Sequence, residues 1–568
     1  MELADFIMVA RGDAPADILL KDAQVINVFT GRIQKTNIAI VEERIVGLGD
    51  YTARRVVDLG GRYVSPGFID AHVHIESAMV PPPEFARAVV PRGVTTVVAD
   101  PHEIANVLGL EGIRYMLDMA KYNPLSMYVM APACVPSTDM ETTGAALHWY
   151  DLQTLQHEPY VLGLGEMMNY LGVVNGLPEA LDKLRAFQGR VKDGHAPGLR
   201  GKGLMAYAAA NIGSDHECTT VEEAHERLAL GMFVFLREAT SARNLSDLLP
   251  LVNGHTNRRL CFCSDDRVPA DLLGEGSIDF MLRTAIHQGV DPIVAIRMAT
   301  LNPSEYFHLH DRGAIAPARL ADLVVFSDLN APHAELVYRH GKLAAEHGEV
   351  VPWQRPRHPP VLRSSVNVDW DKTSLRVPAQ GRRVRVIGAI PDQITSQPLV
   401  EELPERDGEI VADPARDILK MAVIERHLAT GRVGLGFVKG MGLRRGAIAS
   451  TIAHDHHNIV AAGADDQSML TAVRAVVATH GGMAVACENT LMAQLPLPIA
   501  GLMSDQPIEA VCQQMDQLLA AAGQLGSPLR NPFMTLSFLA LPVVPALKLT
   551  DYGLVDVERL ELVSLFVA

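Results

Sequence analysis

The sequence predicts an α/β protein: a (β/α)8 TIM-like barrel, a small β-sandwich built from both of its flanks, and a C-terminal α/β domain. Three observations predict this architecture. Apolar runs of strand length alternate with amphipathic stretches through the middle of the chain. Short apolar bursts separated by turns lie on either side of that stretch, and a proline-rich segment then precedes a further region with strands and helices of its own.

The apolar runs supply the barrel strands. They span residues 68–74, 94–99, 126–130, 161–166, 191–195, 211–216, 232–237 and 260–264. Amphipathic stretches that fit helices fill the gaps, for example residues 177–188, 221–230 and 278–287. Eight such βα units suit a closed barrel. An open doubly wound sheet is the competing arrangement, but no glycine-rich phosphate-binding fingerprint follows the first strand.

Short antiparallel strands are predicted on both flanks of the barrel. They lie at residues 23–28, 37–40 and 44–48 before it, and at residues 321–326 and 334–338 after it. Runs of this length between turn residues are typical of small antiparallel sheets. We therefore expect the two flanks to pair in space as one sandwich.

A proline-rich linker at residues 351–360 introduces the last region. There we predict strands at residues 382–390 and 433–438, and helices at residues 417–428 and 468–480. The expected domains are the first part of the sandwich (1–62), the barrel (63–314), the second part of the sandwich (315–355) and the C-terminal domain (361–568).

Composition narrows the class of protein. A chain of 568 residues is too long for one core, and 48% apolar with 20% charged residues is typical of globular domains. The formal charge of −16 argues against binding to nucleic acid or to an anionic membrane. No apolar run reaches the roughly 18 residues of a membrane span, and the N-terminal residues do not resemble a signal peptide.

Cysteine usage indicates the compartment. Six cysteines without a Cys-x-x-Cys pair suggest reduced thiols, so we expect a cytoplasmic protein. Cys261 and Cys263 flank Phe262 on a predicted strand, where packing in the core is their expected role.

Potential metal ligands stand at the ends of five predicted barrel strands. Because side chains alternate along a strand, His72 and His74 point to the same face. The full set is His72, His74, Glu166, His195, His216 and Asp265. The C-terminal ends of barrel strands meet at one mouth. Four imidazoles and two carboxylates there could hold two divalent ions roughly 3.5–4 Å apart, bridged by a carboxylate. Asp265 is chosen over Asp266 because the predicted strand ends at Ser264.

Several long motifs resemble a known family. Residues 66–74, 264–265 and 321–326 are similar to the amidohydrolase superfamily. Within it, the chain resembles bacterial adenine deaminases at residues 100–109, 163–169, 193–199, 214–218 and 453–458. The resemblance spans nearly the whole chain, including the last region.

The resemblance implies hydrolytic deamination of adenine to hypoxanthine and ammonia, by water activated on the two metal ions. It implies that Asp265 moves a proton from this water to the departing amine and that Glu217 protonates a ring nitrogen. His102 would polarise the substrate or stabilise the addition intermediate, and Asp100 would orient His102 or hydrogen-bond the purine edge. An exposed structural role is the alternative for Glu217. The expected partners are adenine and further copies of the chain.

The resemblance also bears on the metal. Many superfamily members bridge their ions with a carboxylated lysine on the fourth strand, but residues 161–168 contain no lysine and Glu166 takes that place. A site richer in carboxylate favours manganese or iron(II), with zinc as the alternative.

Two other functions stay open at this stage. One is hydrolysis of a cyclic amide, as in hydantoinase-like relatives. The other is a scaffold that binds no metal, against which the intact ligand set argues.

The roles of two further features, outside the set of predicted ligands, can be interpreted in more than one way. His454, His456 and His457 could reach over the barrel mouth or form a solvated loop, and we favour the loop. Ser277 stands where a histidine is usual in the family, so a looser pocket is expected if this residue lies close to the site.

Overall fold

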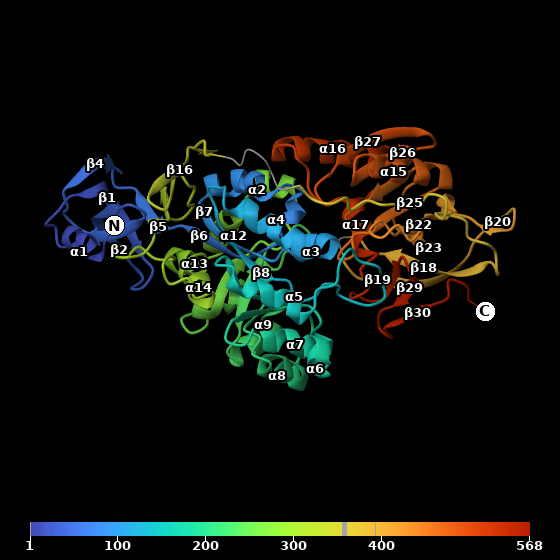
Figure 1. Cartoon of the computed structure of the whole chain (residues 1–568), viewed down its shortest axis with the longest axis horizontal. Helices are drawn as coiled ribbons and strands as arrows, with labels where there is room; N and C mark the ends of the chain where they lie inside the picture. Colours follow the sequence, from blue (N-terminus) through green and yellow to red (C-terminus); the bar gives the residue numbers. More distant parts are fainter. Residues whose placement is uncertain (1, 355–360, 392, 568) are drawn as a thin grey trace.

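The computed structural model describes residues 2–354, 361–391 and 393–567 in three parts (Figure 1). The barrel lies between a β-sheet built near the N-terminus and the C-terminal region, which occupy opposite ends of the molecule. A short helix, α1 (Leu3–Ala10), precedes the first sheet. Within the described residues, no helix is long and apolar enough to cross a membrane.

The barrel consists of parallel strands in sequence order. They are β6 (Phe68–Val73), β7 (Val94–Ala99), β8 (Ser126–Ala131), β9 (Val161–Met167), β10 (Val191–Gly194), β11 (Ser214–Asp215), β12 (Phe233–Arg237) and β13 (Leu260–Cys263). Hydrogen bonds join β6 to β10 as one sheet and β11 to β13 as another. A parallel bridge between Val73 and Asp265 joins β6 to the end of β13, and β10 contacts β11. The predicted barrel is confirmed.

Helices surround these strands. They are α2 (Pro82–Val89), α3 (His102–Leu108), α4 (Leu110–Ala120), α5 (Trp149–Gln153), α6 (Tyr170–Val174), α7 (Pro178–Ala186), α8 (Gly201–Ala209), α9 (Val221–Ala229), α10 (Leu245–Leu248), α11 (Pro269–Gly274), α12 (Ile278–His287), α13 (Pro292–Met298) and α14 (Leu301–Tyr306). Helices α7, α9 and α12 match the three predicted amphipathic stretches. Strand β7 is buried throughout its length, as expected when side chains inside a barrel and helices outside it cover both faces of a strand.

The two flanks form one continuous sheet. Its strands are β1 (Ala16–Asn27), β2 (Arg32–Val41), β3 (Arg44–Leu48), β4 (Ala53–Asp58), β5 (Tyr63–Pro66), β14 (Leu323–Phe326), β15 (Leu336–Arg339), β16 (Lys342–Glu346) and β17 (Glu349–Val350). The antiparallel pair β5–β14 joins the flanks and places Val64 opposite Val325. Strand β5 belongs to this sheet although its residues fall in the range expected for the barrel.

The C-terminal region is built on a sheet in the order β19-β18-β23-β22-β25-β24-β26-β27. These strands are β18 (Arg383–Ala389), β19 (Ser396–Glu402), β22 (Ile418–Ile424), β23 (Val433–Lys439), β24 (Ala447–Ser450), β25 (Ile459–Gly463), β26 (Gly482–Cys487) and β27 (Thr490–Pro496). Smaller sheets contain β20 (Glu405–Arg406), β21 (Glu409–Ile410), β28 (Leu547–Thr550), β29 (Gly553–Asp556) and β30 (Glu561–Val563). The helices are α15 (Asp466–Ala478), α16 (Ile508–Gln524) and α17 (Pro532–Phe538).

One predicted element of this region is wrong. Residues 417–428 were expected to form a helix but contain β22, which pairs antiparallel with β23 and β25. All residues of β22 are buried, so the run shows no alternation that would distinguish it from a buried helix. Of the predicted linker, residues 355–360 lie outside the described part of the chain.

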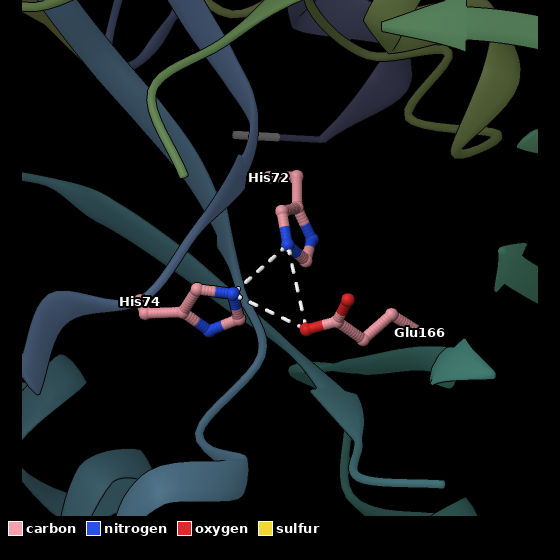
Figure 2. Close-up of side chains that lie close together, drawn as sticks. All are labelled: His72, His74 and Glu166. Atoms are coloured by element: carbon pink, nitrogen blue, oxygen red, sulfur yellow. Dashed lines mark hydrogen bonds and ion pairs between the residues drawn. The ribbon is translucent and has the colours of Figure 1, made fainter. Parts of the chain in front are cut away.

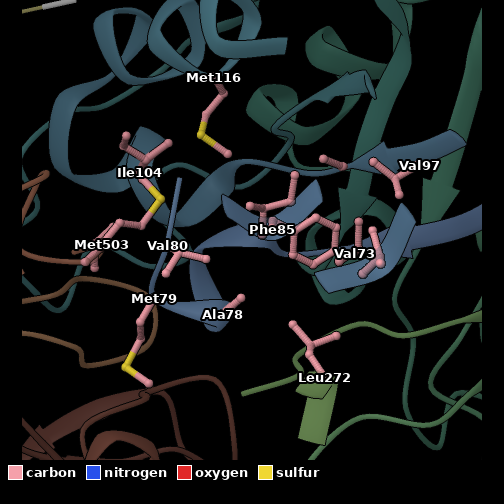
Figure 3. Close-up of a cluster of buried hydrophobic side chains, with 14 of the residues drawn as sticks. Val73, Ala78, Met79, Val80, Phe85, Val97, Ile104, Met116, Leu272 and Met503 are labelled. Carbon is pink, nitrogen blue, oxygen red and sulfur yellow. The ribbon is translucent and has the colours of Figure 1, made fainter. Parts of the chain in front are cut away.

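Apolar packing joins the C-terminal region to the barrel. Figure 3 shows Met503 beside Ile104 and Val80, and all three belong to one buried cluster. The backbone N–H of Ser504 also donates a hydrogen bond to the carbonyl oxygen of Met79 (2.8 Å). These contacts hold the C-terminal region against the barrel near its mouth.

Candidate metal centre and active site

The six predicted ligands converge at the C-terminal end of the barrel. His72 and His74 come from the end of β6, and their Nε2 atoms lie 3.1 Å apart. Nε2 of His74 lies 3.2 Å from Oε1 of Glu166 on β9. Figure 2 shows both rings turned toward that carboxylate. Two facing imidazole nitrogens need a proton or a cation between them, so this group has the chemistry of a metal site.

The other oxygen of Glu166 faces a second pair of histidines. Oε2 lies 2.6 Å from Nδ1 of His195 and 3.4 Å from Nε2 of His216. His195 follows β10 directly and His216 follows β11 directly. Each carboxylate oxygen therefore serves one histidine pair, which is the arrangement of a ligand shared by two ions. Both groups are among the sets of described side chains whose ligand atoms are close enough to hold a metal ion.

Asp265 completes the set beside His74. Its Oδ1 lies 3.1 Å from Nε2 of His74 and 3.8 Å from Nε2 of His72. The residue has a left-handed backbone (φ 52°), fixed by an N–H bond to the carbonyl of His72 (3.0 Å). Such strain is characteristic of functional sites. Asp266 also lies near His74, but its carboxylate accepts a hydrogen bond from Ser77.

Charges within the cluster set the ionisation of its carboxylates. Burial raises the pKa of Glu166, but His195, His216 and His74 outweigh it and hold this pKa well below its usual range. The pKa of Asp265 is likewise held low, because His74 and Arg237 outweigh the effect of burial. Both carboxylates are thus in the ionised form that binds a metal ion.

The two histidines of β6 differ in charge. Burial and the neighbouring imidazoles of His216 and His74 lower the pKa of His72 well below its usual value. Burial also acts against His74, but the carboxylates of Asp265 and Glu166 raise its pKa well above the usual value. A metal ion would therefore displace a proton from His74, because the neutral imidazole is the ligand form.

Glu217 and Arg237 form a buried ion pair beside this cluster. Glu217 is only 7% exposed, so the alternative of an exposed structural residue is wrong. Nη1 of Arg237 contacts Oε1 of Glu217 and lies 3.1 Å from Oδ2 of Asp265. Arg237 had no predicted role, although it ends the seventh barrel strand just as the predicted ligands end or follow theirs.

His102 and Asp100 have different positions. His102 lines the cavity, and its Nδ1 lies 3.4 Å from Oε1 of Glu166. Asp100 does not line the cavity. Its Oδ2 accepts a hydrogen bond from the backbone N–H of Glu166 (2.8 Å), and its Oδ1 lies 3.8 Å from Nδ1 of His102. This geometry favours an orienting role for Asp100 over contact with the substrate.

Ser277 lies behind the site. It is fully buried, and its hydroxyl donates to Oδ2 of Asp70 at 3.4 Å. Asp70 also accepts a hydrogen bond from the backbone N–H of Ser264 (3.0 Å) and so links β6 to the end of β13. Ser277 is not among the residues that line the cavity, so the small side chain does not enlarge it.

The histidines at residues 454–457 reach the barrel, so the expected solvated loop is wrong. His454 and His457 contact the two carboxylate oxygens of Glu103, at the start of α3. His456 is fully buried, and the ring of His454 stacks on Phe538 at 5.1 Å between centroids. We call residues 454–457 the roof loop. This loop covers the barrel mouth and ties the C-terminal region to it.

We call the six predicted ligands the metal-ligand cluster. A cavity of about 130 Å³ lies between this cluster and the roof loop. The polar side chains that line it on the barrel side are His74, His102, Glu103, Glu166, His195, His216, Glu217, Arg237, Ser241, Asp265 and Asp266. Met168, Tyr170, Pro197, Ala239 and Ala242 line it there as well, and the C-terminal region contributes Ile394, His454, Asp455, Phe538, Leu541, Val543 and Val544. The cavity thus combines many charged and polar groups with apolar contacts. This suits a small planar ligand with a few polar atoms.

Sequence comparisons decide the family. A model described as "Amidohydrolase family" matches residues 63–345, and one described as "Adenine deaminase C-terminal domain" matches residues 393–561. An adenine deaminase from Desulfatibacillum aliphaticivorans is 50% identical over 562 residues, covering 99% of each chain. The chain belongs to the adenine deaminase family. Further adenine deaminases come from Carboxydothermus hydrogenoformans (48% identical, covering 99% of each chain) and Methanothrix thermoacetophila (46%, covering 100% of each).

Membership of the adenine deaminase family confirms the predicted resemblance. The C-terminal match covers the roof loop and α17, which line the cavity. The region that sets this family apart is thus the region that closes the site.

Proposed function

We propose that this protein deaminates adenine hydrolytically to hypoxanthine and ammonia, in purine salvage or catabolism. The observation that carries the proposal is Glu166, whose two oxygens face two separate histidine pairs inside a cavity closed by the C-terminal region. Relatives named adenine deaminase, 44–50% identical over nearly the whole chain, support this choice of substrate.

We further propose two divalent metal ions per chain. His72 and His74 would hold one ion, His195 and His216 the other, with Glu166 shared between them and Asp265 completing the set. When bound, such ions supply a water whose pKa is lowered from about 15.7 toward neutrality, and hence a nucleophile for C6 of adenine. The carboxylate content favours manganese or iron(II), with zinc as the alternative.

Asp265 is the proposed proton carrier. Its low pKa keeps it ionised at neutral pH, so it can accept the proton of the attacking water. It then delivers that proton to the amino group at C6, the C–N bond breaks and ammonia leaves. Transfer by a positioned group is typically worth about 10²–10⁴-fold in rate.

Glu217 and His102 would act on the ring. Glu217, whose carboxylate Arg237 fixes in position, would relay the second proton of the attacking water to a ring nitrogen, which takes up negative charge as the bond to C6 forms. Burial lowers the pKa of His102, but Glu103 and other carboxylates outweigh it and raise this pKa well above its usual value. A positively charged imidazole there would stabilise negative charge as it develops on the adduct.

The metal content is the first prediction. Protein prepared without oxygen should contain about two equivalents of a divalent ion by elemental analysis, and a chelator should abolish ammonia release from adenine. Adding back manganese should restore the activity. Ammonia release by metal-free protein that resists chelators would contradict the proposed centre, whereas protein with neither bound metal nor activity would favour the scaffold alternative.

Glu217→Gln provides the second prediction. The amide cannot deliver a proton, so we expect kcat for adenine to fall about 10²-fold or more while the metal content is unchanged. Glu222→Gln, at an exposed position on α9, is the control and should behave as wild type. Near wild-type turnover by the Glu217 variant would leave that residue a structural role only.

A substrate panel tests the function as a whole. Manganese-loaded protein is incubated with adenine and, separately, with hydantoin, and the release of ammonia and the opening of the ring are followed. Turnover of adenine alone supports deamination. Turnover of hydantoin alone would make the protein a cyclic amide hydrolase on the same barrel.

We also propose that the enzyme is cytoplasmic and a homo-oligomer. All six cysteines lie in the described part of the chain and none forms a disulfide, as in proteins of reducing compartments. Helix α1 exposes Leu3, Ile7 and Met8, an apolar surface that association of chains would cover. Light scattering on the purified protein would give the number of chains.

A further inference from the structure

Asp455 differs from its neighbours in the roof loop. His454 and His457 contact Glu103, and the ring of His456 is 3.2 Å from the carbonyl oxygen of Ala540. Asp455 is only 3% exposed, yet its Oδ2 has no hydrogen-bond partner within the part of the chain that the structure describes. Its Oδ1 lies 3.9 Å from Nε2 of His102, which is too far for a hydrogen bond.

The position of Asp455 suggests what would satisfy it. Asp455 lines the same cavity as the metal-ligand cluster. A buried carboxylate oxygen without a partner costs free energy, and native proteins seldom leave one except where a ligand or water supplies the donor. Asp455 therefore places a buried carboxylate, one oxygen of which has no hydrogen-bond partner among the described residues, at the roof side of the cavity.

His102 lies between Asp455 and the metal-ligand cluster. Its Nδ1 lies 3.4 Å from Oε1 of Glu166, and its Nε2 lies 3.9 Å from Oδ1 of Asp455. One imidazole ring thus separates Asp455 from the shared carboxylate. A purine placed with C6 at the Glu166 end would direct its five-membered ring toward the roof, where Phe538, Leu541 and Val544 also line the cavity.

We propose that Asp455 accepts a hydrogen bond from the ring N–H of the five-membered ring of adenine, and so selects the free base. This inference rests on the proposed function. In free adenine the hydrogen is on N9 or, in the minor tautomer, on N7. A nucleoside, or a base alkylated at N9, has no hydrogen on either atom and leaves the carboxylate unpaired. Sites that leave a buried polar group unpaired discriminate strongly against such ligands.

The surrounding charges are compatible with this role. Burial raises the pKa of Asp455 above its usual value, and the neighbouring His102 offsets only part of this effect. An N–H donor placed against the carboxylate favours its ionised form, so binding of the base and ionisation of Asp455 support each other.

The test compares adenine with 9-methyladenine in the metal-loaded, full-length protein. KM and kcat are measured for adenine, and 9-methyladenine is measured as a competitive inhibitor of adenine turnover. We expect Asp455→Ala to raise KM for adenine about tenfold or more with a smaller change in kcat. The inhibition constant of 9-methyladenine should stay the same or fall, because this ligand never makes the contact and leaves the wild-type carboxylate unpaired. Asp455→Asn should restore part of the affinity for adenine, because its amide oxygen can still accept the bond.

Several controls keep the result specific. Metal content and the thermal midpoint show whether each variant is folded and loaded. Asp551→Asn changes another buried carboxyl group of the C-terminal region, one that is bonded to Thr142 and does not line the cavity. This control should leave KM for adenine and the inhibition constant of 9-methyladenine unchanged.

If Asp455→Ala weakened the binding of adenine and of 9-methyladenine equally, the inference would be overturned. Such a result would indicate that Asp455 positions His102 or that the substitution disrupts the structure of the site. A loss confined to kcat would overturn it as well. Wild-type protein that releases no ammonia from adenine would instead reject the proposed function, so the two failures are distinguishable.

Discussion

Asp265→Asn is expected to retain at least one metal ion while kcat for adenine falls by roughly 10⁴-fold, at the upper end of the range for transfer by a positioned group. The substitution preserves the size of the side chain and an oxygen that can bind a metal ion or accept a hydrogen bond. It removes the capacity to carry a proton from the attacking water to the departing amine. The loss should appear in kcat and in kcat/KM alike, because the proton moves only in the transition state.

The measurement combines elemental analysis with steady-state kinetics of ammonia release. Asp266→Asn is the matched comparison, since it makes the same change one residue further along, at a carboxylate that also lines the cavity but accepts a hydrogen bond from Ser77. We expect this variant to keep most of the activity. A large loss in Asp266→Asn with little change in Asp265→Asn would exchange the roles of the two residues.

The barrel and its ligand cluster could be predicted because both depend on local patterns. A strand covered on both faces is a continuous apolar run, and β7, all of whose residues are buried, is typical. In a barrel, the residues that follow such runs meet at one mouth. Polar residues at the ends of β6, β9 and β13 therefore predicted a shared site before any contact was known, and Arg237 at the end of β12 could have been added by the same argument.

The predictions for β22 and for the roof loop were wrong because both structures depend on contacts between residues far apart in the sequence. Strand β22 is a central antiparallel strand buried throughout, so its sequence lacks the alternation that marks a half-buried strand. The roof loop looked like a polar loop because its histidines have their partner far away in the sequence. His457 contacts Glu103 across 354 positions, a pairing that a single sequence does not reveal.

The roof loop also explains why the C-terminal region belongs to the active site. Glu103 starts the helix that follows β7, and burial raises its pKa, but His454 and His457 outweigh this and hold it well below the usual range. Their contacts couple the closure of the cavity to the folding of both regions. Met503, packed beside Ile104 in Figure 3, adds an apolar contact to the same junction.

Free adenine is expected to be preferred over adenosine by roughly 10⁴-fold or more in kcat/KM. The cavity of about 130 Å³ is small compared with ligand pockets of about 300–1,000 Å³. Leu541, Val543 and Val544 line this cavity, and in the orientation proposed for adenine a ribose on N9 would be directed toward them. Discrimination would come from this excluded volume together with the hydrogen bonds to the ring edge.

The measurement is kcat/KM for adenine, adenosine and several 6-substituted purines with the same metal-loaded preparation. Leu541→Ala enlarges the cavity and should reduce the ratio of kcat/KM for adenine to that for adenosine. Leu491 on β27 is 42% exposed, and Leu491→Ala should leave this ratio unchanged. Equal or better turnover of adenosine by the wild-type protein would overturn the preference for the free base. That outcome would not affect the barrel or the proposed metal site, because both concern the reacting end of the purine and not its N9 substituent.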